Sequence, residues 1–467
     1  MNLPPESLQQ KLKQHSQQHV LQFWDQLNSQ QRSDLVDQIN DIDLALIDQL
    51  IAGEDQKPDF AAMAAAASPP PAVKSDGTGA SWTVQQAHQR GEQALRDGEV
   101  GAVLVAGGQG TRLGFDQPKG MFEIGPVSGR TLFQMFADRL QAIATCYGAN
   151  IPLYIMTSAA TDAETRSYFQ SNDYLGLNSD DVTIFQQGTM PAVDSATGKL
   201  LMSSKSSLAL SPDGHGGTVR ALHRSGCLDD ASKRGIKHFA YFQVDNPLVA
   251  LCDPELIGHH LMAASEMTTQ VVRKRYPMEK VGNVVLIDGK VEIIEYSDLP
   301  ESAANVLDDD GEIRLWAGNI AVHVIDREFL VRMNESVDAL PFHRASKKVA
   351  FVDPSGQSVT PEEPNAIKFE RFIFDLLPAA NNGFVVESLP SEAFAPVKNA
   401  NGAPTDTPEL AMAAISDLHA SWLRKAGAKI ADGVKVEINP RFALNFDALS
   451  GKLPANLTIT EDKYFDI

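Results

Sequence analysis

The central part of the chain alternates short apolar runs with amphipathic segments. Between residues 101 and 270, continuous apolar runs such as HFAYFQV (238–244) are typical of buried strands. Their alternation with helical patterns predicts an α/β fold with a mostly parallel sheet. The expected strands are residues 103–106, 152–157, 182–186 and 238–244, and the expected helices are residues 82–97, 131–147 and 162–171.

The N-terminal part and the C-terminal part show other patterns. Apolar residues recur at helical spacing among Gln and Lys within residues 1–52, which predicts helices. Residues 53–81 are rich in Ala, Pro, Gly and Ser, a composition typical of an extended, mobile linker. Near the C-terminus, short apolar pairs alternate with Pro, Asn and Gly, which predicts a small β unit with strands at 434–438 and 457–459.

From residue 271 onwards the pattern becomes more β-like. Two apolar runs, 283–287 and 291–296, flank Asp288 and Gly289, which predicts a β-hairpin with a type I′ turn. Further strands are expected at 320–324 and 384–388. We therefore expect a helical N-terminal region (1–95, with the linker at about 53–81), a large central domain (96–425) and a small C-terminal β domain (426–467).

The first expected strand leads into a glycine-rich stretch, AGGQGTRLGFDQPKG (residues 106–120). Glycine lets the backbone turn sharply and bring its N–H groups close to a ligand. Arg112 and Lys119 lie within this stretch, and backbone donors together with two cations suit a polyphosphate. The structural alternative is a tight strand-to-helix turn whose Arg and Lys face solvent.

Three known phosphate-binding motifs do not match this stretch. A Rossmann fingerprint requires glycine at the position of Leu113. A P-loop requires Gly-Lys followed by Ser or Thr, whereas Lys119 lies between Pro118 and Gly120. A protein kinase requires a His-Arg-Asp triplet, which the chain lacks. The stretch is therefore interpreted as a phosphate-binding loop of another kind.

Composition and charge narrow the class of ligand. The 467 residues carry a formal net charge of −20, and the longest basic run, residues 273–275, is too short to indicate a nucleic-acid groove. An anionic ligand must therefore be met by a few local cations and a metal ion. The cysteines, Cys146, Cys227 and Cys252, show no metal-binding spacing. Without an apolar signal segment or a membrane-length apolar run, we expect a cytoplasmic protein with no membrane partner.

Asp245 and Asn246 directly follow the expected strand at 238–244. A carboxylate in this position can hold Mg²⁺ while phosphate oxygens complete the coordination. Because ligands of a parallel sheet bind at the carboxyl ends of its strands, we expect Asp245 and Gly107 to share one crevice. The structural alternative for Asp245 is an ordinary cap at the end of a strand.

Other polar side chains follow strands or glycine-rich turns. Gln187 and Gly188 follow the strand at 182–186, and an amide beside a glycine can read the edge of a base. The remaining candidates are Gly214 and His215 in a second glycine-rich loop, Glu295 at the end of the hairpin, Asn319 at the start of a strand, and Lys368 and Lys398. For each of them, an ordinary loop or a solvated side chain is the structural alternative.

The order Gly-Gly-x-Gly-Thr-Arg-Leu-Gly, followed by Pro-Lys-Gly, resembles the signature of the eukaryotic-type UTP:sugar-1-phosphate uridylyltransferases. Within that family the chain is most similar to the UDP-N-acetylglucosamine pyrophosphorylases, over about residues 95–425. The segments FHRASKKVAFVD (342–353), NAIKFERFIFDLL (365–377) and FAPVKN (394–399) share this similarity. The resemblance implies a GT-A-like (Rossmann-like) nucleotidyltransferase core at 96–425 with smaller flanking domains.

The resemblance also implies an activity and its partners. UTP and a sugar 1-phosphate, above all N-acetylglucosamine 1-phosphate, would give a UDP-sugar and pyrophosphate with Mg²⁺ or Mn²⁺ as the metal. The nucleophile is an anionic phosphate oxygen, so no general base is needed, and no Ser-His-Asp or Cys-His set is evident. We expect a monomer or a weak homo-oligomer.

The resemblance assigns roles residue by residue. It implies a catalytic role for Arg112, Lys119 and Lys398, and a metal-binding role for Asp245. The residues implied to bind the nucleotide are Gly107, Gly108, Gly110, Thr111, Lys119, Gln187, Gly188 and Gly214. The residues implied to bind the sugar phosphate are His215, Asn246, Glu295, Asn319 and Lys368.

Two alternatives remain beside this assignment. His215 stands where N-acetylglucosamine enzymes usually have Asn and glucose-type enzymes have His, which keeps open a glucose or broad-specificity UDP-sugar pyrophosphorylase. The other alternative is a non-catalytic nucleotide-sugar sensor. The simultaneous presence of Asp245 and the three cations argues against a sensor, which would not need them all.

Overall fold

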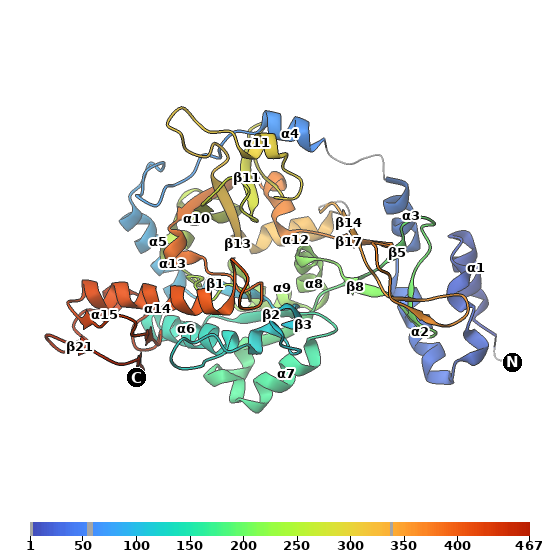
Figure 1. Cartoon of the computed structure of the whole chain (residues 1–467), viewed down its shortest axis with the longest axis horizontal. Helices are drawn as coiled ribbons and strands as arrows, with labels where there is room; N and C mark the ends of the chain where they lie inside the picture. Colours follow the sequence, from blue (N-terminus) through green and yellow to red (C-terminus); the bar gives the residue numbers. More distant parts are fainter. Residues whose placement is uncertain (1–2, 54–58, 337–339) are drawn as a thin grey trace. The chain divides into compact units, whose positions relative to one another are not determined.

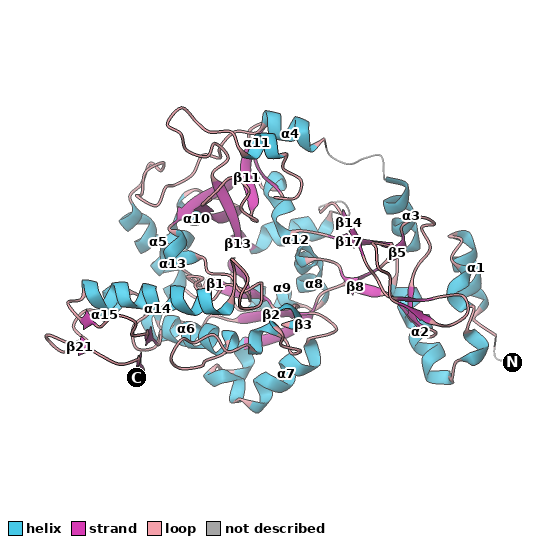
Figure 2. Ribbon diagram, in the orientation of Figure 1, coloured by secondary structure: helices cyan, strands magenta, loops and turns pink. Residues whose placement is uncertain are grey.

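The computed structural model describes residues 3–53, 59–336 and 340–467 (Figures 1 and 2). The chain forms two compact units. The first unit comprises Met1–Asp59, Gln187–Gly217 and Leu340–Ile373, and the second comprises Phe60–Gln186, Thr218–Ala339 and Phe374–Ile467. Each unit therefore combines segments that are far apart in the sequence. The domain boundaries expected near residues 95 and 425 stay predictions.

A mostly parallel sheet forms the centre of the second unit. Its strands are β1 (Val100–Val105), β2 (Leu153–Thr157), β3 (Val182–Gln186), β9 (His238–Gln243), β10 (Met267–Arg273), β11 (Gly282–Ile287), β12 (Lys290–Ile294), β13 (Ala317–Asp326) and β18 (Gly383–Ser388). Their order is β12-β11-β13-β9-β1-β2-β3, and β10 pairs with β13 and β18. β1 is parallel to β2 and β9, while β13 is antiparallel to β9 and β10. The expected α/β fold class is confirmed.

The apolar pattern predicted most of these strands, but it missed β10. Three residues in the middle of β10, Thr268, Thr269 and Gln270, are polar yet buried. The side-chain amide of Gln270 donates to Ser388 Oγ on β18 at 2.6 Å, which satisfies part of its hydrogen-bonding capacity. A search for hydrophobic runs therefore missed β10, because several of its buried residues are polar.

The hairpin between β11 and β12 has the turn expected from its sequence. Asp288 has φ 49° and Gly289 has φ 79°. A type I′ turn needs positive φ at both central residues, which Asp and Gly tolerate better than other residues. The prediction of a type I′ hairpin is therefore confirmed.

Helices cover both faces of the central sheet, and α7 and α8 lie on opposite sides of β3 in Figure 1. The helices of this unit are α4 (Phe60–Ala66), α5 (Val84–Arg96), α6 (Leu132–Tyr147), α7 (Asp162–Ser171), α8 (Thr218–Arg224), α9 (Cys227–Lys233), α10 (Pro254–Met262), α11 (Glu301–Ala304), α12 (Arg327–Glu335), α13 (Pro390–Ala393), α14 (Pro408–Lys425) and α15 (Phe446–Leu449). α6 begins with a capping box between Thr131 and Gln134 and ends before the left-handed Gly148. Its apolar face packs Phe133 and Phe136 into the core.

Part of the segment expected as a linker is structured. Residues 60–66 form α4, because this Ala-rich sequence favours a helix. Ser68 and Val73 then pair with the sheet through their backbone N–H groups, which donate to Leu286 O and Val385 O, each at 3.0 Å. Residues 60–66 are thus helical where a linker was expected, and Ser68 and Val73 are tied to the sheet, while residues 54–58 lie outside the described residues.

The C-terminal part contains the strands expected there. β19 (Lys429–Ile430) is parallel to β21 (Thr458–Ile459), and β20 (Val436–Ile438) is parallel to β22 (Lys463–Phe465). A separate hydrophobic cluster joins them to the end of α14 through Leu423, Val436 and Ile459, among others. The predicted strands at 434–438 and 457–459 are therefore confirmed to within two residues.

The first unit combines the N-terminal helices with short strands from two later segments. Its helices are α1 (Glu6–Gln14), α2 (Ser29–Asp41) and α3 (Leu44–Ala52), and its strands are β4 (Thr189–Pro191), β5 (Val193–Asp194), β6 (Met202–Ser204), β7 (Ser207–Leu208), β8 (Leu210–Pro212), β14 (His343–Lys347), β15 (Phe351–Val352), β16 (Ser358–Val359) and β17 (Ala366–Glu370). Leu12 and Leu35 share one buried cluster with Val193 and Phe369. The helices expected within residues 1–52 are confirmed.

Replacement of Gly120 by alanine is expected to destabilise the second unit. A Cβ on Gly120 would lie 2.1 Å from Cζ of Phe133, whose ring is buried in the core. Such overpacking typically lowers the free energy of unfolding by about 1–3 kcal/mol. Urea denaturation followed by circular dichroism will measure the loss.

Gly108→Ala is the matched control, because a Cβ at Gly108 meets nothing within 4 Å. This variant is expected to unfold at nearly the same urea concentration as the unmodified protein. Equal stability of the two alanine variants would contradict the proposed packing of Gly120 against Phe133.

Candidate functional site

The glycine-rich stretch and Asp245 follow two neighbouring strands of the same sheet. β1 and β9 are parallel, and Val105 at the end of β1 pairs with Gln243 at the end of β9. The backbone N–H of Val244 donates to Val105 O at 3.0 Å, so the pairing continues past the end of β9. Gly107 and Asp245 therefore lie at the same edge of the sheet, as expected, where ligands of α/β folds bind.

The glycine-rich stretch folds back on itself beyond β1. Gly110 N–H donates to Gln117 O at 2.9 Å, and Lys119 N–H donates to Gly108 O at 3.1 Å. In the part of the chain that the structure describes, the backbone N–H groups of Gly107 and Gly108 have no hydrogen-bond partner. Exposed backbone donors in such a turn form a concave surface that suits phosphate oxygens.

Lys119 lies within electrostatic reach of the other charged candidates in this unit. Its pKa is lowered mainly by burial, and Lys398 and Arg112 lower it further, while Asp245 opposes the shift. Its ammonium donates to Val397 O at 3.2 Å, and Val397 N–H donates to Asp245 O at 2.8 Å. The structure thus places Lys119, which is largely desolvated, within electrostatic reach of two other cations and one carboxylate. Such an arrangement is unfavourable alone and suits a polyanionic ligand.

Asp406 lies near Asp245 and Lys398, although no sequence motif around Asp406 indicated a functional role. Its carbonyl oxygen accepts the N–H groups of Lys398 at 2.8 Å and Asn399 at 2.9 Å, with φ 60° at Asp406. Burial raises the pKa of its carboxyl and Asp245 adds to the rise, while Lys398 opposes it. Asp406 therefore holds the backbone at Lys398 and adds a second carboxylate near Asp245. It was missed because it lies in an irregular polar loop.

Asn246 has a structural position next to Asp245. It is 3% exposed, its amide donates to Ala393 O at 2.8 Å, and its Oδ1 accepts the N–H of Ala395 at 3.1 Å. These two bonds fix the segment that leads to Lys398. Both polar atoms are thus engaged by backbone, and the role of Asn246 at the sugar phosphate stays a prediction.

Glu295 and Asn319 lie on either side of Gly282. A Cβ on Gly282 would lie 3.1 Å from Glu295 Oε1 and 3.6 Å from Asn319 Cβ. Asn319 pairs with Gly282 across β11 and β13, and its Oδ1 accepts the N–H of Ala321 at 3.0 Å. Ala321 has φ 55°, at an irregularity in the pairing of β10 with β13. The structure therefore brings together a carboxylate and an amide, both suited to sugar hydroxyls, beside a residue without a side chain.

A buried lysine stabilises the backbone next to Gly282, and no motif in the sequence indicated it. Lys274 is 4% exposed, and its ammonium donates to Asn283 Oδ1 at 2.6 Å and to Pro277 O at 3.1 Å. Burial lowers its pKa to about 8, and Glu279 opposes the shift. Lys274 holds Asn283, the neighbour of Gly282, in place. The sequence indicated only a short basic run, because burial cannot be read from three adjacent cations.

The remaining candidates lie in the first unit, where two loops come together. β4 pairs with β8, and the N–H of Asp213 donates to Gly188 O at 3.1 Å. A Cβ on Gly188 would lie 2.6 Å from Asp213 Oδ2, and a Cβ on Gly217 would lie 2.2 Å from Asp213 Oδ1. The glycines therefore make room for the Asp213 carboxylate. The loop with Gln187 and the second glycine-rich loop are thus neighbours.

His215 is held within this second loop by the segment that follows β17. Its Nδ1 accepts the N–H of Ile373 at 3.2 Å, and its ring stacks on Phe372 with centroids 5.2 Å apart. With Nδ1 accepting, a neutral ring carries its proton on Nε2. Gly214 has φ 84°, and a Cβ there would lie 2.3 Å from Arg371 O. Lys368 lies on β17 opposite Ala345.

The surroundings of Asp245 fit a magnesium ion better than a transition metal. Among the described residues, Asp245 belongs to no group of three His, Cys, Asp or Glu side chains that converge on one point. Mg²⁺ commonly binds through one or two carboxylates, with water and substrate phosphates as the other ligands. Asp245, with Asp406 nearby, satisfies this requirement.

Within the described ranges, no helix combines the length and the apolar character that crossing a membrane requires.

Comparisons with known proteins agree with this geometry. The profile of the UTP–glucose-1-phosphate uridylyltransferase family matches residues 71–429. The chain is 40% identical to the UDP-N-acetylglucosamine pyrophosphorylase of Saccharomyces cerevisiae over 367 residues, or 77% of each chain. It is 35% identical to the UDP-N-acetylglucosamine diphosphorylase 2 of Arabidopsis thaliana over 94% of this chain and 89% of that one. The fold resembles the uridine diphosphate N-acetylglucosamine pyrophosphorylase of Trypanosoma brucei, with TM-score 0.82, 24% identity and 99% of each chain covered.

Proposed function

The chain belongs to the UTP–glucose-1-phosphate uridylyltransferase family, and on this premise we propose that it is a UDP-N-acetylglucosamine pyrophosphorylase. It makes UDP-N-acetylglucosamine and pyrophosphate from UTP and N-acetylglucosamine 1-phosphate. The observation that carries this proposal is the group of Lys119, Lys398 and Arg112 around Asp245, at the carboxyl ends of β1 and β9. A nucleotide-sugar sensor would not need three converging cations.

The reaction is an in-line displacement at the α-phosphorus of UTP. An oxygen of the sugar phosphate forms a new P–O bond, and the bond between the α-phosphorus and the oxygen bridging to the β-phosphate breaks. The electron pair of that bond leaves with pyrophosphate. The nucleophile is already an anion at neutral pH, so the protein has to overcome repulsion rather than remove a proton. Positioning and charge neutralisation are therefore the main contributions of the protein.

We assign separate tasks to the three cations. Arg112 is exposed in the glycine-rich stretch and meets the departing pyrophosphate. Lys119 is part-buried beside Asp245, and Lys398 lies on the adjoining loop, so both neutralise charge at the α-phosphate. The backbone N–H groups of Gly107, Gly108 and Thr111 bind the remaining phosphate oxygens or the adjoining nucleoside. Gly110, whose own N–H donates to Gln117 O at 2.9 Å, contributes to nucleotide binding by shaping the turn.

Asp245 is the residue that would hold Mg²⁺ or Mn²⁺, and Asp406 is the second carboxylate within electrostatic reach. A bound divalent ion supplies additional positive charge for phosphate oxygens and orients them. The protein itself contributes a carboxylate on a fixed backbone, because the backbone oxygen of Asp245 accepts the N–H of Val397 at 2.8 Å.

The residues of the first unit keep the roles that their resemblance implies. We propose that Gln187 and Gly188 bind the uracil and that Gly214 contacts the nucleotide. The missing side chain at Gly214 makes room for the backbone of Arg371, since a Cβ would lie 2.3 Å from Arg371 O. We propose contacts to the sugar phosphate for His215 and Lys368. A monomeric or weakly associated protein in the cytoplasm stays a prediction.

The identity of the sugar does not follow from the family alone, because His215 is the residue that glucose-type enzymes have at this position. Against glucose, the relatives from Saccharomyces cerevisiae and Arabidopsis thaliana, at 40% and 35% identity, are named as N-acetylglucosamine enzymes. Relatives from Xenopus tropicalis and Mus musculus, at 35% and 36% identity, are named as N-acetylhexosamine pyrophosphorylase-like proteins. Glu295 and Asn319 flank Gly282, where a Cβ would lie 2.9 Å from Ile293 Cγ2, so the two side chains meet at a residue without a side chain, and we propose that they contact the sugar hydroxyls.

Turnover with N-acetylglucosamine 1-phosphate is expected to exceed turnover with glucose 1-phosphate by at least tenfold, which corresponds to about 1.4 kcal/mol of discrimination. The measurement is kcat/KM for pyrophosphate release from UTP with the 1-phosphates of N-acetylglucosamine, N-acetylgalactosamine, glucose and galactose. Equal rates with glucose would favour the broad-specificity alternative. Release with none of the four sugars would favour the sensor.

A further inference from the structure

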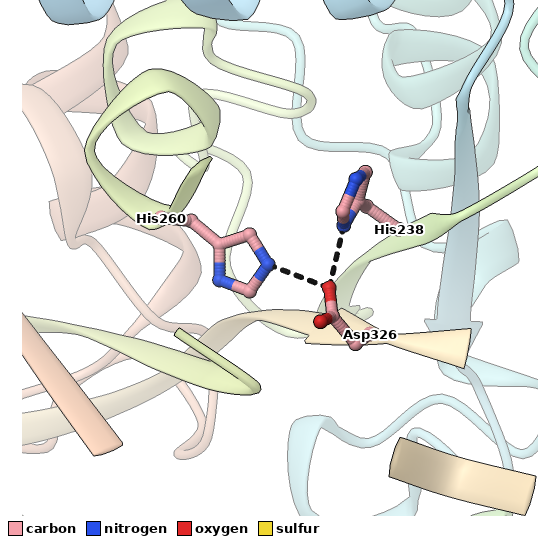
Figure 3. A group of neighbouring side chains, drawn as sticks. All are labelled: His238, His260 and Asp326. Carbon is pink, nitrogen blue, oxygen red and sulfur yellow. Dashed lines mark hydrogen bonds and ion pairs between the residues drawn. The ribbon is translucent and has the colours of Figure 1, made fainter. Parts of the chain in front are cut away.

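Three side chains converge at the end of the central sheet that lies away from Asp245 (Figure 3). His238 begins β9, Asp326 ends β13, and these two residues are direct partners in the pairing of the strands. His260 comes from α10. Asp326 Oδ1 lies 2.6 Å from His238 Nδ1 and 2.9 Å from His260 Nε2, so both rings point at the same oxygen atom.

Thr268 fixes the orientation of the His260 ring, at the ring nitrogen that does not face Asp326. Its Nδ1 lies 2.9 Å from Thr268 Oγ1, and His260 and Thr268 are 1% and 0% exposed. When Nδ1–H donates to this hydroxyl, the lone pair of Nε2 faces the carboxylate of Asp326. Two facing electron pairs need a cation between them, either a proton or a metal ion. A hydroxyl behind a histidine is also how metal sites commonly fix the orientation of the ligand.

A neutral imidazole and an ionised carboxylate are the forms that coordinate a metal. Each ring already points one nitrogen at Asp326 Oδ1, so metal binding needs a change of tautomer at each ring and no change of side-chain direction.

The donor atoms and their spacing define the class of metal. Two imidazole nitrogens and one carboxylate oxygen suit Zn²⁺ and similar transition metals, whereas Mg²⁺ prefers oxygen ligands alone. All three donor atoms lie within 4.8 Å of one another. Bonds of about 2.0–2.2 Å in a tetrahedral site would separate the ligand atoms by roughly 3.3 Å. A small outward movement of the two rings would make room for an ion.

The side of the group that faces solvent allows an ion to enter. The side chain of Asp326 is 31% exposed and that of His238 is 12% exposed, while His260 is 1% exposed at the inner side. Water can therefore supply the fourth ligand. The group is separated from Asp245 by the length of β9, about 20 Å at roughly 3.3 Å per residue.

We propose that His238, His260 and Asp326 form a Zn²⁺ site that joins the start of β9 to the end of β13 and to α10. This site is distinct from the Mg²⁺ expected at Asp245 and does not depend on the proposed function. The ion would stabilise the central sheet by bridging elements that are otherwise joined here by hydrogen bonds.

The full-length protein, treated with EDTA and dialysed, is expected to bind one Zn²⁺ per chain in the presence of millimolar Mg²⁺. Equilibrium dialysis measures the affinity, and thermal unfolding with and without ZnCl₂ measures the stabilisation. Co²⁺ in place of Zn²⁺ is expected to give the visible absorption of a tetrahedral site. Absence of bound Zn²⁺ would show that the three side chains form only a hydrogen-bonded tie and would overturn the proposal.

His238→Asn is the decisive variant, because an asparagine amide can replace Nδ1–H as a donor to Asp326 while removing the imidazole ligand. It is expected to weaken Zn²⁺ binding by about 100-fold and to unfold at the temperature of the metal-free unmodified protein. Thr268→Val removes the hydroxyl behind His260 with little change of volume and is expected to weaken binding by about tenfold.

His88→Gln is the matched control, because the His88 side chain is 39% exposed on α5, outside the group. Unchanged Zn²⁺ binding in this variant, and in Asp245→Asn, would locate the ion at the proposed site. Unchanged binding in His238→Asn, or an equal loss in His88→Gln, would contradict the assignment.

Discussion

Replacement of Lys119 by alanine is expected to lower kcat by ~10²–10³, the usual cost of removing one preorganised group that stabilises transition-state charge. Lys119 is already largely desolvated and bonded to Val397 O before substrate binds, so we expect little change in its surroundings on binding. It therefore acts without reorganisation at the moment of reaction. The measurement is kcat for pyrophosphate release at saturating UTP and sugar phosphate.

A second variant separates charge from packing. Lys119→Met keeps most of the volume of the side chain and removes only the ammonium, so its kcat is expected to fall as far as that of Lys119→Ala. Lys290→Ala is the control, because Lys290 is an exposed cation of the same unit at the hairpin turn. Near-normal kcat in a folded Lys119→Met protein would exclude the catalytic role of Lys119.

Hydrophobic patterning predicted the central sheet because its strands are encoded locally. β9 has four consecutive apolar residues, FAYF at 239–242, and α6 carries its own capping box and a terminal glycine. The first unit could not be predicted in the same way. Its core joins Leu12 and Leu35 to Val193 and Phe369, and no local pattern states which distant segments share a core.

The candidate site likewise contains some residues that local sequence patterns predicted and others that they did not. Gly107, Lys119 and Asp245 were predicted together because the ends of parallel strands lie at one edge of a sheet. Asp406 and Lys274 were not predicted, because their importance depends on the loop or on the burial that surrounds them. The triad of His238, His260 and Asp326 was missed for a related reason, since its members come from three separate elements.

Replacement of Asp245 by asparagine is expected to lower kcat by ~10²–10³ at a fixed Mg²⁺ concentration and to raise the Mg²⁺ concentration that gives half-maximal activity. Asparagine has the shape of aspartate, and the bond from Val397 N–H to the backbone oxygen of residue 245 is retained. The change therefore removes one negative charge while leaving the loop in place. Rates of pyrophosphate release over a series of Mg²⁺ concentrations measure both effects.

Asp116→Asn is the control for this charge, because Asp116 is an exposed carboxylate within the glycine-rich stretch itself. It is expected to leave both kcat and the Mg²⁺ dependence unchanged. Asp406→Asn tests the second carboxylate, and an intermediate shift of the Mg²⁺ dependence is expected, since Asp406 lies within electrostatic reach of Asp245. If Asp245→Asn shows the Mg²⁺ dependence of the unmodified protein, Asp245 does not hold the metal, and the cations around it act on the phosphates alone.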